Sequence, residues 1–224
     1  MIRVKDLVKI YKSGDSELVV LNGLNLEVKN GEFLSIIGRS GSGKSTLLYQ
    51  LGLLDHPNSG HIDIDEVDTD KLAKDERTRF RLNNLGYVFQ DYALVPELTA
   101  FENVAIPLLM QGKEKSEIKK VATEVLDRIG LGGKLDNLPS QLSGGEQQRV
   151  SIARAISHNP KVLFADEPTA NLDNETSDSV MKVFLALHKQ GQTIIMVTHE
   201  PEYAAMTERT VLLDGGIIKS DKKN

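Results

Sequence analysis

A glycine-rich segment, GRSGSGKST (38–46), carries residue types that bind phosphate. Gly38, Gly43, Lys44 and Ser45 have the spacing of a phosphate-binding loop set between a strand and a helix. The glycines let backbone N–H groups point inward, and the following helix adds its positive N-terminus. We therefore predict that Lys44 contacts the β- and γ-phosphates of a nucleotide and that the Ser45 hydroxyl binds Mg²⁺. The other loop residues predicted to surround the phosphates are Arg39, Ser40, Gly41, Ser42 and Thr46.

An ordinary glycine-rich turn is the alternative interpretation of this segment. From average glycine usage, the pattern arises by chance in a chain of this length about once in a hundred cases, before a flanking strand and helix are required. The phosphate-binding interpretation is therefore favoured.

Two acidic residues follow the apolar run of VLFADE (162–167). The carboxyl end of a strand is where a nucleotide-binding sheet presents its functional side chains. We predict that Asp166 holds Mg²⁺, directly or through water, and that Glu167 accepts a proton from the attacking water as general base. An Asp-Glu pair by itself is more often a solvated turn, and only the phosphate loop reverses that preference.

Three further side chains are candidates for the same site. His199 follows a buried strand directly and precedes Pro201, which suits the first turn of a helix. Gln90 ends the apolar run GYVFQ, where its amide would ligate the metal or orient water. Tyr11 closes the first strand, and stacking on adenine and simple packing are equally good interpretations. In isolation each residue also fits a surface or structural role.

The segment LSGGEQQRV (142–150) combines a helix start with residues that disfavour helix. Ser143 and Glu146 have the spacing of a capping box, but the two residues between them are glycines. Glycine inside a helix costs about 1 kcal/mol relative to alanine. We infer that something approaches the backbone of Gly144 and Gly145 too closely for a side chain.

Continuous apolar runs rich in β-branched residues predict the elements that position these residues. FLSII (33–37), VLFAD (162–166) and TIIMVT (193–198) read as strands buried on both faces, which indicates a central parallel sheet. Apolar residues at helical spacing follow in two segments, one carrying Leu47, Leu48, Leu51 and Leu54 and the other spanning 174–189. The predicted fold class is α/β.

The outer segments have a different pattern. Residues 2–11, 18–28 and 60–67 read as half-buried strands, and 210–220 reads as a hairpin turning at Asp214-Gly215 or Gly215-Gly216. We therefore expect an antiparallel layer beside the parallel core. Between about 91 and 158 the pattern is helical, with one helix over 117–129 and another that begins at the LSGGE motif and stops at Asn159-Pro160.

Composition narrows the class of protein. The 224 residues suffice for one sizeable core, and the absence of cysteine excludes a disulfide framework and a thiolate site. A net charge of −5 argues against a nucleic-acid binder. No apolar run reaches the 18 or more residues of a membrane span, and the first residues lack the pattern of a signal peptide. We expect a cytoplasmic protein.

Taken together, these motifs resemble the ATP-binding subunit of ABC transporters. GRSGSGKST resembles the Walker A loop, Gln90 the Q-loop, LSGGEQ the signature, VLFADE Walker B, ANLD (170–173) the D-loop and His199 the switch histidine. All six occur in the family's order over nearly the whole chain. Arg39 departs from the proline that many members have, at a position where only the local amides need a defined geometry. ADEPTANLD and VFQDYALVPELTAFENVAIPL further resemble the lipoprotein-release, macrolide-export and cell-division branch.

This resemblance implies a P-loop NTPase core of ABC type, with an antiparallel β subdomain and a helical subdomain. The implied boundaries are 1–90 with 159–224 for the nucleotide-binding core and 91–158 for the helical signature subdomain. It also implies that two copies meet head to tail, so that Ser143, Gly144, Gly145 and Glu146 of one copy, with Asp173, contact the ATP of the other. A second anion cradle at a helix N-terminus agrees with this arrangement. The glycines would then face a nucleotide on another chain.

As a motor of this kind, the chain would hydrolyse ATP with Mg²⁺ and drive export or extraction through separate transmembrane subunits. It would lie on the inner face of the cell membrane through those subunits, whose docking groove would include part of the apolar stretch between Asp91 and Leu109. DNA-repair and ribosome-associated ATPases of the family are the alternatives. The first would need a long coiled-coil insertion, and the second usually has tandem cassettes and a basic linker, whereas this chain has one acidic cassette.

Overall fold

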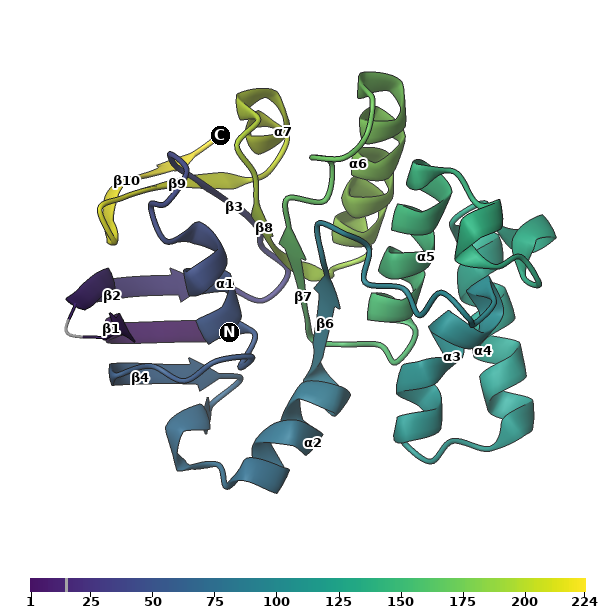
Figure 1. Ribbon diagram of the computed structural model, residues 1–224, viewed down its shortest axis with the longest axis horizontal. Coiled ribbons are helices and arrows are strands. Elements are labelled where there is room, and N and C mark those ends of the chain that lie inside the picture. The colour runs from purple at the N-terminus through teal and green to yellow at the C-terminus, as the bar shows by residue number, and fades with distance from the viewer. Residues whose placement is uncertain (15) are drawn as a thin grey trace. The chain divides into compact units, whose positions relative to one another are not determined.

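The computed structural model describes residues 1–14 and 16–224. Within it the chain forms two compact units, the first made of Met1–Arg79 with Gly191–Asn224 and the second of Phe80–Gln190 (Figure 1). The helices and strands agree with the predicted α/β class. The boundaries inferred by resemblance for the core and helical subdomain stay a prediction.

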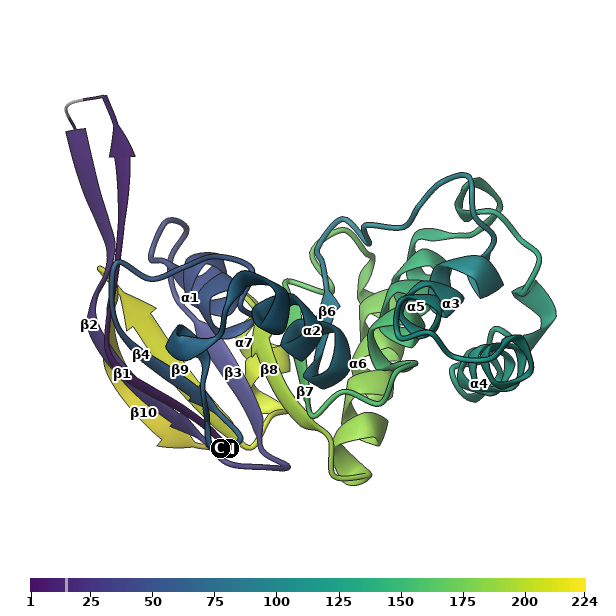
Figure 2. The same cartoon turned by 90° about the horizontal axis from the view of Figure 1, so that it is seen from below.

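An antiparallel sheet in the order β2-β1-β4-β5 occupies one side of the first unit. The long partners β1 and β2 form a ribbon that extends past the shorter strands (Figure 2). Ile2 and Val4 are buried while Arg3 and Lys5 are exposed, which is the alternation expected of a strand with one solvated face. The strands of this sheet are β1 Ile2–Ser13, β2 Ser16–Val28, β4 Ser59–Ile64 and β5 Val67–Asp68.

The first unit also contains strands in the order β10-β9-β3-β8. β3 runs parallel to both β8 and β9, and β9 turns back into β10 at Gly215-Gly216, where φ is 57° and 75°. One of the two predicted turn positions is thereby confirmed, but the hairpin belongs to the sheet of β3 and not to a separate antiparallel layer. The bounds are β3 Phe33–Ile37, β8 Thr193–Val197, β9 Arg209–Asp214 and β10 Ile217–Lys223.

The helix after β3, α1, is shorter than its apolar pattern predicts. It spans Lys44–Leu51, and Gly52 and Leu53 turn the chain, with φ of 56° at Leu53. Leu47, Leu48 and Leu51 are fully buried, whereas Leu54 lies beyond the helix and is 46% exposed. The expectation that Leu54 shares the buried face is therefore wrong. The remaining helices here are η1 Thr69–Lys71, α7 Pro201–Ala205 and α2 Lys74–Asn84, the last of which leads into the second unit.

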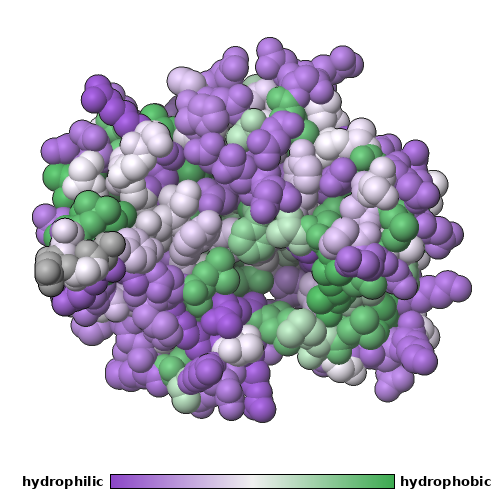
Figure 3. Space-filling model, viewed as in Figure 1, coloured by the Kyte–Doolittle hydropathy of each residue, from purple (hydrophilic) through white to green (hydrophobic). Residues whose placement is uncertain are grey.

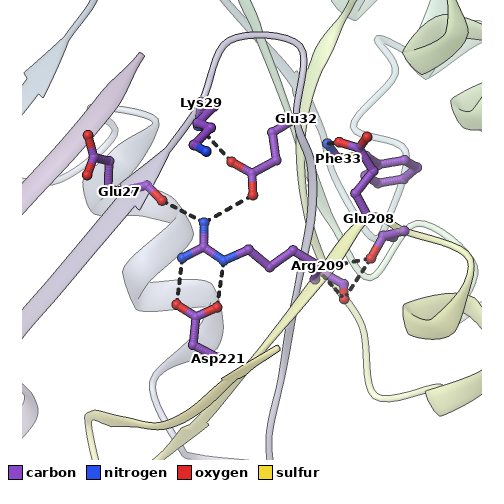
Figure 4. A network of polar contacts seen from close by, with 9 residues as sticks. Glu27, Lys29, Glu32, Phe33, Glu208, Arg209 and Asp221 are labelled. Atoms are coloured by element: carbon purple, nitrogen blue, oxygen red, sulfur yellow. Dashed lines mark hydrogen bonds and ion pairs between the residues drawn. The ribbon is translucent and has the colours of Figure 1, made fainter. Parts of the chain in front are cut away.

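A network around Arg209 ties the ends of several elements of the first unit together (Figure 4). The guanidinium donates to both carboxylate oxygens of Asp221 at 2.6 Å, to Glu32 Oε1 at 3.0 Å and to the Glu27 carbonyl at 2.8 Å. These bonds raise the pKa of Arg209 and lower that of Asp221. Because the four residues come from β9, β10, β2 and the segment before β3, the network joins the edge strands of the unit.

The second unit pairs two parallel strands, β6 and β7, with a helical core. Buried residues of α3, α4 and α5, including Val104, Leu126 and Val150, pack together. Neither β6 nor α2 was predicted as an element, although the predicted helices over 117–129 and 174–189 correspond to α4 and α6. The elements are β6 Leu85–Val88, α3 Ala100–Met110, α4 Lys115–Arg128, η2 Gly132–Lys134, η3 Pro139–Gln141, α5 Gly144–Ile156, β7 Val162–Asp166 and α6 Asn174–Lys189.

Candidate functional site

The phosphate loop lies between β3 and α1, as the sequence predicts. Gly43 adopts φ of 100° and caps α1 without a side-chain hydrogen bond. A Cβ at Gly38 would lie 2.2 Å from the Leu213 carbonyl oxygen, and one at Gly43 would lie 2.8 Å from that of Val20. Backbone thus crowds both glycines, so the loop tolerates no other residue at either position.

Lys44 is the buried cation of this loop, with its side chain folded back over the segment that precedes it. Its Nζ donates to the Gly38 carbonyl at 3.0 Å and to the Arg39 carbonyl at 3.2 Å, and the residue is 7% exposed. Ser42 Oγ is also buried and has no hydrogen-bond partner within the described residues. An ammonium and a hydroxyl donor inside a glycine loop at a helix start are chemically suited to hold phosphate oxygens.

The other predicted loop residues differ in exposure. Arg39, Ser40 and Gly41 are exposed, while Ser45 and Thr46 are half-buried in the first turn of α1. Ser45 is the second residue of α1, directly after Lys44. Its predicted role as a Mg²⁺ ligand stays a prediction.

Tyr11 is held by a polar cluster that sequence patterns did not predict. Its hydroxyl donates to Asp55 Oδ2 at 3.1 Å, and Lys9 Nζ lies 2.7 Å from the same oxygen and 4.9 Å from the Tyr11 ring centroid. Burial alone would raise the pKa of Asp55, but the hydrogen bonds from Lys9, His56 and Tyr11 lower it overall. The cluster fixes a ring that is 42% exposed, and both interpretations of Tyr11 stay open.

His199 lies at the carboxyl end of β8, which is the same end of the first unit's parallel strands as the phosphate loop that follows β3. It is exposed and follows Thr198, the residue after β8. Thr198 Oγ1 accepts from the Glu200 amide at 3.1 Å, and Pro201 begins α7. The predicted strand, His and helix start are confirmed as local structure, while the role of His199 stays a prediction.

Gln90 begins a strained turn in the second unit. It is exposed, and its carbonyl accepts from Asn171 Nδ2 at 3.0 Å. Tyr92 and Ala93 follow with φ of 63° and 48°, a left-handed conformation that is unfavourable for residues other than glycine. Arg154 donates to both of their carbonyls, with 2.9 Å to that of Tyr92. Sequence patterns singled out Gln90 but neither Arg154 nor the Asn171 contact.

The predicted metal ligand and general base lie at the end of β7. Asp166 is the last residue of this fully buried strand and is itself 5% exposed. Glu167 follows with φ of 44° and is half-buried. A non-glycine residue in the left-handed region directly after a buried strand is a feature that clusters at functional sites.

The start of α5 has the predicted capping box. Ser143 Oγ accepts from the Glu146 amide at 3.3 Å, and the Glu146 carboxylate accepts from the Ser143 amide at 2.9 Å. The hydrogen bond from the Ser143 backbone lowers the pKa of Glu146, and Lys134, 3.8 Å away, lowers it further. The helix therefore carries its own anion at its N-terminus.

Neighbours within the same chain crowd the two signature glycines, Gly145 more severely than Gly144. A Cβ at Gly144 would lie 3.0 Å from the Tyr92 hydroxyl and 3.3 Å from Leu172 Cδ2. A Cβ at Gly145 would lie 2.2 Å from Cγ2 of Thr176. Sequence reasoning attributed both glycines to a nucleotide on another chain and missed this internal cause. The contact with a second chain stays a prediction.

Asp173 is the N-cap of α6. Its carboxylate accepts from the Thr176 amide at 2.9 Å and from the Thr176 hydroxyl at 2.8 Å, and these bonds lower its pKa. The residue is exposed, and the predicted nucleotide contact stays a prediction.

Among the described residues, no group of three His, Asp or Glu side chains is close enough to form an all-protein metal site. Mg²⁺ is commonly bound by one or two protein oxygens together with substrate phosphates. The Ser45 hydroxyl and the Asp166 carboxylate are oxygen ligands of the kind that this ion prefers.

An apolar groove of about 700 Å³ lies between α3 and α4 (Figure 3). Its lining includes Phe101, Ile106, Leu109 and Ile118, with Lys119 among the charged residues beside them. Leu109 is 58% exposed, and the neighbouring Met110 is 65% exposed. Exposed apolar surface of this kind marks a candidate interaction site.

No helix in the described part of the chain combines the length and apolar character that crossing a membrane requires.

Comparisons with known proteins converge on one family. The family model described as "ABC transporter" matches residues 21–170. The lipoprotein-releasing system ATP-binding protein LolD of Aquifex aeolicus is 48% identical, over 97% of this chain and 96% of that protein. The macrolide export ATP-binding/permease protein MacB of Syntrophobacter fumaroxidans is 46% identical over 99% of this chain, which spans 31% of that protein. A dimeric structure of the ATP-binding cassette MJ0796 in a post-hydrolysis state, bound to ADP and Pi, superposes with a TM-score of 0.92. It is 41% identical, with 100% of this chain and 98% of that chain covered.

Proposed function

Since this chain belongs to the ABC transporter family and is the ATP-hydrolysing subunit of such a transporter, we propose that it works as a homodimer closing head to tail around ATP. The observation that carries the proposal is the phosphate loop, where Lys44 and crowded glycines form an anion cradle at the start of α1. The dimeric state of the cassette MJ0796 supports the assembly.

In the first unit, the loop residues bind the phosphates and Lys44 supplies a positive charge to the β- and γ-phosphates. The Ser45 hydroxyl, the Asp166 carboxylate and the Gln90 amide would hold Mg²⁺. Mg²⁺ supplies charge neutralisation at the transferred phosphoryl group. Tyr11, fixed through Asp55, supports the adenine.

Glu167 is the general base, which takes a proton from the attacking water. Gln90 orients this water, and His199 donates a hydrogen bond toward the γ-phosphate from the first unit. Glu167 is favoured over Asp166 as the base because Asp166 is almost fully buried at the strand end, whereas Glu167 is half-buried one residue later.

Ser143, Gly144, Gly145 and Glu146 contact the ATP held by the partner copy, with Asp173 beside it. The backbone amides at the start of α5 would supply the donors. ATP then favours the closed dimer, and its hydrolysis removes the charge that both copies hold. This cycle of dimer closure and opening is the movement that would drive transport.

The general-base assignment is tested with Glu167→Gln, which keeps size and an amide hydrogen-bonding group. Hydrolysis should fall by about 10² to 10⁴, the usual contribution of a general base. ATP should still bind, so the variant should accumulate as an ATP-bound dimer in size-exclusion chromatography. Glu124→Gln, an exposed substitution on α4, is the control and should behave like the wild type. A Glu167→Gln protein that stays monomeric with ATP, or hydrolyses it at the normal rate, would refute the assignment.

The head-to-tail arrangement has a separate test with mixed variants. Each heterodimer of a Lys44→Ala copy and a Ser143→Arg copy has one site with both lesions and one site with neither. Activity should therefore recover on mixing to a level above either variant alone. Absence of recovery, under conditions where heterodimers are shown to form and one intact site suffices for hydrolysis, would contradict contact across the dimer.

The groove between α3 and α4 is proposed to receive a segment of a separate transmembrane permease subunit on the inner face of the cell membrane. Support comes from its exposed apolar residues and from the MacB relative, whose name includes a permease and which is longer than this chain. The cargo would be a lipoprotein, lipid, peptide or drug that is extracted or exported. The names of the two relatives support this direction, since one refers to lipoprotein release and the other to macrolide export.

Co-expression with a candidate transmembrane permease, chosen from the genes that neighbour this one, tests the groove. Leu109→Asp should abolish copurification with that permease while the ATPase activity of the isolated chain stays unchanged. The matched control is Lys120→Asp, at an exposed position of α4 outside the groove lining. Copurification of the Leu109 variant at wild-type yield would show that the permease docks elsewhere.

A further inference from the structure

One buried amide joins α5 to the segment that follows β7. Gln148 is fully buried, and its Nε2 donates to the carbonyl of Pro168 at 2.8 Å. Pro168 directly follows Glu167, and both Gln148 and Glu167 belong to the second unit. The Gln148 side-chain amide is therefore hydrogen-bonded to the backbone carbonyl of the residue that follows the proposed general base.

The backbone at Glu167 needs such support. Its φ of 44° lies in the left-handed region, which is unfavourable for a residue with a Cβ. The Glu167 carbonyl accepts from the Ala170 amide at 3.2 Å, which closes a turn over these residues. Gln148 fixes the carbonyl inside this turn, so the two hydrogen bonds together restrain the backbone that carries the Glu167 side chain.

Packing alone does not explain a glutamine at this position. Gln148 Oε1 is buried without a hydrogen-bond partner in the described residues, and an unsatisfied buried acceptor is destabilising. A methionine would fill the same space without that cost. Methionine has no hydrogen-bond donor for the Pro168 carbonyl, so the contact to the Glu167 turn is the property that distinguishes glutamine here.

Gln148 is also two residues after Glu146, in the second turn of the helix whose first turn is the signature. We propose that Gln148 is a positioning residue through which α5 holds the Glu167 turn, coupling a nucleotide at the signature to the general base of the same subunit. This inference rests on the proposed general base and head-to-tail dimer. In that dimer, α5 contacts the ATP of the partner while Glu167 acts on the ATP of its own copy. The link therefore makes hydrolysis at one site depend on occupation of the other.

Gln148→Met is the test, with ATPase rates of the full chain measured over a range of ATP concentrations. We expect kcat to fall about tenfold, KM for ATP to stay within about twofold, and the Hill coefficient to move toward 1. Gln111→Met is the matched control. It removes the side-chain hydrogen bonds from Gln111 Nε2 to the Leu82 carbonyl and to Asn83 Oδ1, both at 3.2 Å, and both of these partners lie outside α5 and the Glu167 turn. The control should keep both kcat and cooperativity.

A merely structural role is excluded by a double variant. If Gln148 acts through Glu167, then Gln148→Met added to Glu167→Gln should neither lower residual hydrolysis further nor prevent the ATP-bound dimer. Gln148→Asn provides a second substitution that preserves the amide but shortens its reach by one methylene, and it should reproduce the loss of kcat. Wild-type kcat and Hill coefficient in folded Gln148→Met or Gln148→Asn protein would overturn the inference. An active Glu167→Gln protein would instead overturn the proposed general base.

Discussion

The helices α1 and α5 both begin beside glycines, but their first turns are built in opposite ways. α1 starts after Gly43 in the left-handed region, and no side chain caps it. α5 starts after Ser143, and Ser143 and Glu146 satisfy one another's backbone donors in a capping box. Since the first N–H groups of a helix need acceptors, α1 is built for an external anion, whereas α5 already has an internal one.

The glycines of the two segments also differ in what crowds them. Backbone carbonyls of Leu213 and Val20 lie against Gly38 and Gly43, and these cannot be removed by substitution. Gly145 is crowded by a side-chain methyl, Cγ2 of Thr176. At α5, a second substitution can therefore remove the atoms that crowd the glycine, so that the effect of crowding can be measured apart from any contact with a nucleotide. At the phosphate loop the crowding atoms are backbone, and no second substitution can remove them.

The largest effect is expected at α1. Lys44→Ala removes the buried ammonium, so ATP affinity measured by calorimetry should fall by about 100-fold, in line with the loss of charge-assisted hydrogen bonds. Turnover should be lost with binding. Lys5→Ala, at an exposed position of β1, should leave affinity unchanged. Wild-type affinity in the Lys44 variant would show that α1 is not the anion site.

A second prediction separates the two reasons for Gly145. Gly145→Ala places a Cβ 2.2 Å from Thr176 Cγ2 and should lower the free energy of unfolding by about 2 kcal/mol through overpacking. Thr176→Ser removes this methyl but keeps the hydroxyl that bonds to Asp173. Adding it to Gly145→Ala should therefore restore stability, measured by denaturant unfolding.

The ATPase activity of the Gly145→Ala/Thr176→Ser protein then shows whether Gly145 also faces a partner's nucleotide, which a stability measurement cannot show. If the glycine also faces a partner's nucleotide, activity stays low in a stable protein. If activity returns together with stability, the packing of Thr176 is the whole reason for the glycine, and the contrast with α1 extends to function.

The sequence predicted what is set by local pattern. β3, β7 and β8 were predictable because strands buried on both faces read as continuous apolar runs, and the capping box of α5 was predictable from residues three apart. The phosphate loop was predictable because its glycines, lysine and serine lie within nine residues.

Contacts between distant segments were not predictable in this way. Three such contacts join residues that are 20 or more apart in the sequence and share no local motif. They are the packing of the Thr176 methyl against Gly145, the hydrogen bond from Arg154 to the Tyr92 carbonyl, and the hydrogen bond from the Gln148 amide to the Pro168 carbonyl. The parallel pairing of β9 with β3 was missed for the same reason, since the hairpin pattern specifies the turn but not the neighbouring strand.

A smaller effect is expected from the cap itself. Ser143→Ala removes the acceptor of the Glu146 amide and should lower the free energy of unfolding by about 1 kcal/mol. Thermal unfolding would measure this change, with Ser140→Ala, at an exposed position before the helix, as the control. Unchanged stability would mean that α5 does not depend on its own cap, and the contrast with α1 would weaken.

The smallest and most informative change is Glu146→Gln, which keeps a capping-box acceptor but removes the internal anion of α5. At neutral pH the free energy of unfolding should fall by about 0.5 kcal/mol, the usual scale of a charge at a helix N-terminus. The Ser143 backbone bond lowers the pKa of Glu146 below its ordinary value of 4.5, so this contribution is present above that value and is lost as pH falls through the lower folded-state pKa. Wild type and variant should therefore converge in stability on acidification, with Glu124→Gln showing no such convergence.

Glu146→Gln should act in the opposite direction on assembly. If the start of α5 faces a partner's ATP, removing its carboxylate reduces repulsion of the phosphates, and the Glu167→Gln dimer should form at a lower ATP concentration. An unchanged ATP requirement for that dimer, in a protein whose stability shifts as expected, would show that the internal anion of α5 serves the helix alone.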